Sequence, residues 1–142
     1  MALNPKTGTT ARNNACNGAV DTIDSGPGNG YTSIYTGAPP ANPQAASTGT
    51  LLAVVNHPKP AFGNAGAVTP GVASANAMTG VTALASGDAG YYRTFDSTGT
   101  NCHLQGTAGE AADTPDMVFD DKSFVAGGTV TLTGYTVTMP EQ

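Results

Sequence analysis

The side chains of this chain that could do chemistry are few, and their spacing fits no established catalytic motif. The only histidines are His57 and His103, and the only cysteines are Cys16 and Cys102. A structural zinc site takes four such ligands, so the fold would have to bring both histidines to a cysteine or a carboxylate. Cys102 and His103 are adjacent, and a strand places adjacent side chains on opposite faces. We therefore expect no zinc site.

Motifs for nucleophilic catalysis and phosphate binding are absent from the sequence. There is no Gly-x-Ser-x-Gly turn, no phosphate-binding loop with its lysine, and no Gly-x-Gly-x-x-Gly between a strand and a helix. The sequence therefore predicts that the protein is not an enzyme and that it holds no cofactor.

Carboxylates gather in one segment, 110–121. It contains Glu110, Asp113, Asp116, Asp120 and Asp121. Calcium binds to loops rich in carboxylate oxygens, but this spacing matches no twelve-residue calcium loop, and a solvated acidic turn is the ordinary interpretation. A carboxylate pair could also hydrolyse a glycosidic bond, which leaves a small hydrolase as a distant alternative. The absence of Trp and an aromatic content of 6% argue against a sugar-stacking cleft.

Composition favours a protein that works in an assembly. Its 142 residues suit one domain, and only 11% of them are charged, against about a quarter in typical soluble domains. Few charges would have to be desolvated in a contact with partners. Monomeric β-proteins with threonine-rich surfaces are the alternative.

Basic residues are scattered along the chain rather than clustered. They are Lys6, Arg12, Lys59, Arg93 and Lys122, in a chain of net charge −5. This distribution excludes a basic stripe for nucleic acid. No apolar run approaches the length of a membrane span or a signal peptide, so we expect no membrane contact and synthesis in the cytosol. A disulfide between the two cysteines is conceivable, but a reducing cytosol favours free thiols.

The C-terminal segment 124–140 predicts a strand with one irregularity. Val130 and Leu132 alternate with threonines, whereas after Gly134 the apolar residues fall on odd numbers, beginning with Tyr135 and Val137. An extra residue must absorb this change of parity, so we predict a β-bulge at or near Gly134. All four apolar side chains would then face one core, and Gly134→Val should destabilise the fold.

The remaining segments predict a mainly β fold with one helix. Residues 10–24 place Ala11, Ala15, Cys16, Ala19, Val20 and Ile23 on one stripe of an amphipathic helix, which we expect to close an open end or face of the β-core. Segments 31–36, 50–55, 91–96, 101–105 and 117–119 predict strands, the second one central and the third and fourth a hairpin. We predict a β-sandwich of jelly-roll or Greek-key type. It would form one domain, 9–142, preceded by an N-terminal arm, 1–8.

The order of these segments resembles a family of small structural proteins of tailed bacteriophages and prophages. The residues that carry the resemblance are Thr10–Asp21, Tyr31–Ala41, Gly49–Ala53, Pro60–Gly63, Gly90–Ser97 and Val125–Val130. They are turn and strand motifs rather than active-site motifs, and they extend over nearly the whole chain.

This resemblance implies a virion protein, foremost a capsid decoration or cement protein on the outer head shell that binds the major capsid protein. A tail-associated or head-fibre protein is the alternative. By analogy with other head decorations the protein would self-associate, as a trimer. As partner-contacting residues we predict Asn4, Pro5 and Lys6 of the arm, together with Tyr31 and Tyr92. For both tyrosines a place in the core is the competing interpretation.

Overall fold

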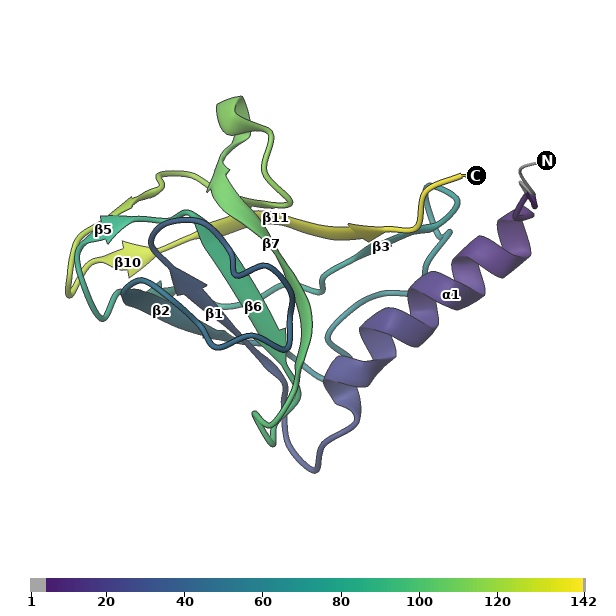
Figure 1. Ribbon diagram of the computed structural model, residues 1–142, viewed down its shortest axis with the longest axis horizontal. Helices are drawn as coiled ribbons and strands as arrows, with labels where there is room; N and C mark the ends of the chain where they lie inside the picture. Colours follow the sequence, from purple (N-terminus) through teal and green to yellow (C-terminus); the bar gives the residue numbers. More distant parts are fainter. Residues whose placement is uncertain (1–4, 142) are drawn as a thin grey trace.

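The computed structural model describes residues 5–141, which form a curved sheet with a helix at one end (Figure 1). The helical segments are α1 (Thr9–Asp21), η1 (Thr22–Asp24) and η2 (Ala111–Asp113). The strands are β1 (Tyr31–Tyr35), β2 (Leu51–Asn56), β3 (Val72–Ser74), β4 (Val81–Thr82), β5 (Gly87–Asp88), β6 (Tyr91–Phe95), β7 (Cys102–Glu110), β8 (Met117–Phe119), β9 (Ser123–Phe124), β10 (Thr129–Val130) and β11 (Leu132–Thr138).

The main sheet has seven strands in the order β2-β1-β6-β7-β8-β11-β3. All neighbours are antiparallel except β7 and β8, which are parallel. Two small sheets, β4 with β10 and β5 with β9, lie at the end of the molecule far from α1, giving a sandwich-like arrangement (Figure 1). The mainly β class with one N-terminal helix is thus confirmed, whereas the jelly-roll connectivity stays a prediction.

The helix forms where it was predicted, but its buried stripe is narrower. Cys16, Val20 and Ile23 are buried, whereas Ala11 and Ala15 are exposed. The helix packs on β3 and β11 at one end of the sheet, so it does close an end of the core.

Polar side chains of α1 supply the contacts that the alanines do not. The Oδ1 atoms of Asn13 and Asn17 accept hydrogen bonds at 2.7 Å from the backbone N–H groups of Gly71 and Ala65. The Arg12 guanidinium donates at 3.0 Å to the carbonyl of Met139. The helix is therefore fixed to backbone groups, which a hydrophobic periodicity does not reveal.

The predicted bulge in the last strand is present. Leu132 pairs with Phe119 and Gly134 pairs with Val118, so Thr133 is the extra residue. Val130, Leu132, Tyr135 and Val137 accordingly all contact the same core. The loss of stability expected of Gly134→Val stays a prediction. A Cβ atom at this position would lie 3.7 Å from its nearest neighbour, the Cβ of Val118, which is an ordinary contact.

Both edge strands of the main sheet, β2 and β3, are covered by loops. Strand β2, predicted to be central, is instead an end strand of this sheet, and the carbonyl of Leu52 accepts a hydrogen bond from the N–H of Leu84 at 2.7 Å. At the other end, the carbonyls of Ser74 and Val72 in β3 accept from Gly63 and Gly66 at 2.9 and 3.0 Å. These bonds occupy polar groups through which an end strand could pair with another chain.

Candidate functional site

A candidate surface site lies on one face of strands β1, β6 and β7. Cross-strand pairs stack Tyr31 on Phe95, with ring centroids 5.3 Å apart, and Tyr35 on Tyr91, with centroids 5.0 Å apart. Arg93 lies between these two rows. Because side chains alternate along a strand, residues 32, 34, 92 and 94 point to the opposite face, into the core.

The loop between β1 and β2, residues 37–50, crosses this face and is called the strap below (Figure 1). Three side chains of the sheet hold it. Arg93 donates to the hydroxyl of Ser47 at 2.7 Å and to the carbonyl of Pro43. Tyr91 exchanges hydrogen bonds with the backbone of Thr48, and the Gln105 amide donates to the carbonyl of Pro40 at 2.8 Å.

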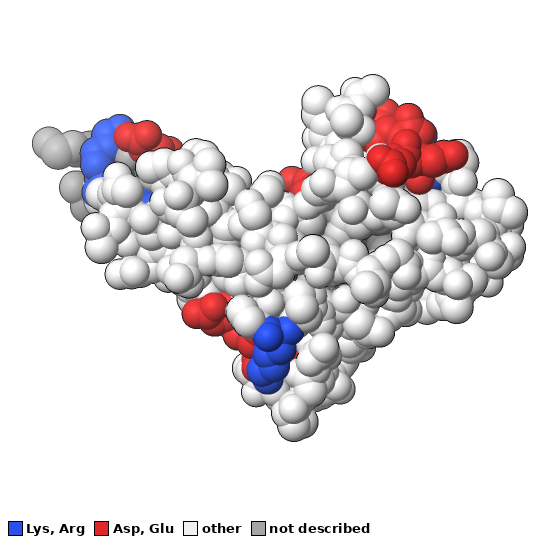
Figure 2. Space-filling model, turned by 180° about the vertical axis from the view of Figure 1, so that it is seen from behind, with Lys and Arg blue, Asp and Glu red and all other residues white. Residues whose placement is uncertain are grey.

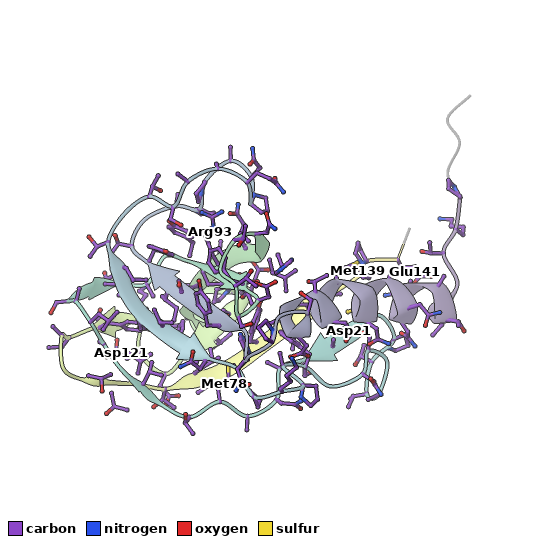
Figure 3. The ribbon with its side chains drawn as sticks, turned by 90° about the horizontal axis from the view of Figure 1, so that it is seen from below. Asp21, Met78, Arg93, Asp121, Met139 and Glu141 are labelled. Atoms are coloured by element: carbon purple, nitrogen blue, oxygen red, sulfur yellow. The ribbon has the colours of Figure 1, made fainter. Side chains whose placement is uncertain are left out.

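Between the strap and the β6–β7 turn lies a cavity of about 270 Å³. It is lined by Pro43, Gln44, Ala45, Ser47, Arg93, Phe95, Thr100, Asn101 and Cys102. Arg93, labelled in Figure 3 between strap and sheet, is only 4% exposed. Its guanidinium carbon lies 5.8 Å from the centroid of Phe95. The site is therefore a small, mostly polar cavity with a buried cation in its wall.

The predicted partner-contacting residues do not come together in one place. Tyr31 is half-buried on the strap-covered face. Tyr92 points to the other face and is 4% exposed, so its assignment to a partner surface is wrong, and the competing core interpretation holds. Pro5 and Lys6 are exposed ahead of α1, and Asn4 lies outside the described residues.

A buried polar chain runs through the core behind this site. The Nε2 atom of His57 lies 2.7 Å from the hydroxyl of Thr32, which lies 2.7 Å from that of Thr94, which in turn lies 2.9 Å from that of Tyr135. All four residues are at most 3% exposed. His57 is therefore a packed core residue with no surface to offer to a substrate.

The stability of the protein should depend on pH through His57. Burial lowers the pKa of this imidazole to about 4 from 6.5, against a smaller opposing effect of Asp24. Between these values the unfolded chain binds more protons, so stability is lost as the pH falls below 6.5. We expect the free energy of unfolding to fall by about 1.5 kcal/mol between pH 6.5 and pH 5 on this account.

Urea titrations followed by circular dichroism at both pH values check this expectation. His57→Gln should remove most of this difference, and the matched variant His103→Gln should keep it, because it retains the buried His57. Equal pH dependence in the wild type and His57→Gln would contradict the assignment.

The other groups with metal-binding potential do not assemble. Cys16 and Cys102 are free thiols, and burial raises the pKa of Cys16, whose Sγ lies 3.3 Å from the carbonyl of Val137. His103 lies 3.6 Å from a carboxylate oxygen of Asp96. Within residues 5–141, no three His, Cys, Asp or Glu side chains lie close enough together to hold a metal ion.

Carboxylates of the acidic segment 110–121 form hydrogen bonds and an ion pair with nearby residues. Asp113 forms an ion pair of 2.8 Å with Lys122, and hydrogen bonding to this ammonium is the main cause that lowers the pKa of Asp113. The Asp116 carboxylate accepts from the N–H and the hydroxyl of Thr107 at 2.9 and 3.0 Å. The Asp121 carboxylate accepts from the N–H of Ser123 at 2.8 Å. These bonds are those of a solvated turn.

Arg93 is the site residue that the sequence interpretation missed, since it was counted only among the scattered cations. A signal was available. Arg93 lies in the middle of Tyr91–Phe95, a strand whose remaining residues are all aromatic or threonine. The chain has only 5 basic residues, so one of them inside such a strand stands out. A cation at the centre of such a strand must find compensation in the fold.

Comparisons with protein-family models, with curated proteins and with solved structures found no match. Among the described residues, the helices are too short or too polar to span a bilayer.

Proposed function

We propose that this protein is a virion structural protein of a tailed bacteriophage, foremost a capsid decoration or cement protein that binds the major capsid protein on the outer head shell. The observation that supports this most is a surface poor in charge. Most of the basic side chains form hydrogen bonds or ion pairs with other parts of the same chain. Figure 2 shows one face that is largely uncharged, with acidic groups confined to a few places.

Internal contacts engage most of the cations. Arg12 and Lys59 donate to the carbonyls of Met139 and Gly26, at 3.0 and 2.9 Å. Arg93 donates to the strap and Lys122 pairs with Asp113. Such a surface can contact a shell over a broad area with little desolvation of charge, as a permanent attachment requires. Lys6, which is exposed ahead of α1, is placed to contribute a charged contact.

Hydrogen bonds between segments far apart in the sequence suit a protein that must resist mechanical load. Side chains of α1 bond to loop backbone, and side chains of β6 and β7 bond to the strap. The loops that cover the two edge strands, β2 and β3, limit their pairing with strands of another chain. A trimer would therefore form through another face, and sedimentation that shows monomers alone, free and released from particles, would remove self-association from the proposal.

Addition of the purified protein to mature shells that lack it is expected to give saturable binding and to raise the temperature at which the shells burst. Removal of residues 1–8 should weaken binding if the arm contacts the shell, and the truncated protein should keep its circular dichroism spectrum. No binding and no change in bursting temperature would contradict the cement role. Electron microscopy of labelled particles then tests the alternative, since label confined to the tail or to vertices indicates a tail or head-fibre protein.

A further inference from the structure

We propose that the cavity under the strap binds a carboxylate group, with the guanidinium of Arg93 as its counter-charge. This inference concerns the site alone and does not depend on the proposed virion role.

The first argument is charge. A buried ion is costly unless an opposite charge or a complete set of hydrogen bonds compensates it. Arg93 is 4% exposed, and no carboxylate of the described residues lies within 4.0 Å of its nitrogens. Its protein partners are a hydroxyl and a carbonyl of the strap, both neutral. The positive charge therefore lacks a counter-ion.

The second argument is hydrogen bonding. The Nε–H of Arg93 is buried and has no acceptor within residues 5–141. The Oε1 atom of Gln105, the residue paired with Arg93 across β6 and β7, is also buried without a partner. Unsatisfied buried polar atoms are uncommon in folded proteins. The Nε–H of Arg93 is a donor that a carboxylate can satisfy, whereas the Oε1 atom of Gln105 is an acceptor and needs a donor instead.

The third argument is the match between the cavity and the ligand class. Its volume of about 270 Å³ suits a small anion or one acidic side chain. A planar carboxylate of single negative charge matches a single guanidinium, whereas a phosphate would bring more charge than one cation balances. Thr100 and Asn101 in the wall offer further polar groups.

The strap forms one wall of the site and supplies the contacts that a ligand would replace. The backbone takes positive φ angles of 83° and 77° at Gly37 and Gly49, near the two ends of the strap. Glycine adopts such angles without steric cost, so the strap can turn onto the sheet at both ends. The bonds of Arg93 to Ser47 and Pro43 are the contacts that an incoming carboxylate would exchange or share.

The test is a titration followed by the Arg93 Nε–H signal in ¹⁵N-edited NMR spectra, at constant ionic strength with chloride as the balancing anion. The expected result is a saturable shift of this signal and of the Thr100 and Asn101 amides with sodium acetate. N-acetylglutamate amide and N-acetylglycine serve as further probes, because they present a side-chain and a terminal carboxylate. A response to either indicates a peptide source, and a response to acetate alone indicates a free small carboxylate.

Two variants make the test specific. Arg93→Gln should abolish saturation at the Thr100 and Asn101 amides. If Arg93→Gln does not fold, Ser47→Ala serves instead. It frees one Nη1 donor and should bind acetate several-fold more tightly. A linear, non-saturating response, tighter binding of inorganic phosphate than of all the carboxylates, or unchanged affinity in Ser47→Ala would overturn the proposal. None of these outcomes bears on attachment to shells, so the two proposals fail separately.

Discussion

Tyr135→Ala is expected to lower the free energy of unfolding by about 4 kcal/mol, the largest loss for any single truncation that we propose. Tyr135 is 3% exposed and contacts rings from three other segments. The centroids of Phe62 and Tyr92 lie 5.0 and 4.9 Å from its own, both edge-on, and that of His57 lies 6.1 Å away. Alanine would leave a cavity among rings whose backbones are held by strand pairing at Tyr92, by an isolated bridge at Phe62 and by a hydrogen bond to Gly30 at His57.

The hydroxyl of Tyr135 adds a smaller contribution. It lies 2.9 Å from the hydroxyl of Thr94 and ends the buried polar chain that begins at His57. Tyr135→Phe should therefore cost only about 1 kcal/mol. Tyr35→Ala is the matched control, because Tyr35 lies half-buried on the strap-covered face and should lose less than Tyr135→Ala.

Urea unfolding followed by circular dichroism measures all three variants. A loss for Tyr135→Ala no greater than that for Tyr35→Ala would mean that the rings around position 135 repack, and would contradict the central place assigned to this side chain.

Gly90→Ala is expected to cost about 3 kcal/mol, through overpacking rather than loss of contact. A Cβ atom at position 90 would lie well inside van der Waals contact with the carbonyl oxygen of Gly37, and 2.8 Å from its nitrogen. The backbone here cannot easily retreat. The N–H of Gly90 donates to the carbonyl of Tyr35 at 2.9 Å, and its carbonyl accepts from Ala108 at 3.0 Å.

Gly134→Ala is the control for this experiment. The Cβ atom that it adds meets only Val118, at 3.7 Å, and alanine suits a strand at least as well as glycine. Thermal unfolding should show a large drop for Gly90→Ala and little change for Gly134→Ala. The reverse order would show that the bulge in β11, rather than the approach of the strap, limits what the backbone tolerates.

The two glycines illustrate what periodicity can and cannot reveal. The change of parity after Leu132 required an extra residue, and the bulge at Thr133 lies where that reasoning placed it. Nothing in the sequence near Gly90 indicated that residue 37 would press against it, because that contact joins a loop to a strand far along the chain.

Local patterns were reliable wherever neighbours in sequence decide the structure. The helix, the β6–β7 hairpin and the β11 bulge follow from spacing within short segments. Strand β2 was misplaced, because a continuous apolar run shows that a strand is buried but not which neighbours bury it. The outer edge of β2 is covered by a loop at Leu84, whose N–H donates to the carbonyl of Leu52 as a neighbouring strand would.

The sequence by itself determined a charge-poor, mainly β chain with one helix, without catalytic motifs and with a bulged last strand. These properties follow from composition and from the spacing of apolar residues within short segments. Only the tertiary structure decided that Tyr92 is core while Tyr31 lies on the strap-covered face, and that Arg93 is buried under the strap with no carboxylate of the described residues beside it. These properties depend on which segments lie opposite one another across the sheet, and burial and compensation of a charge are set by those neighbours.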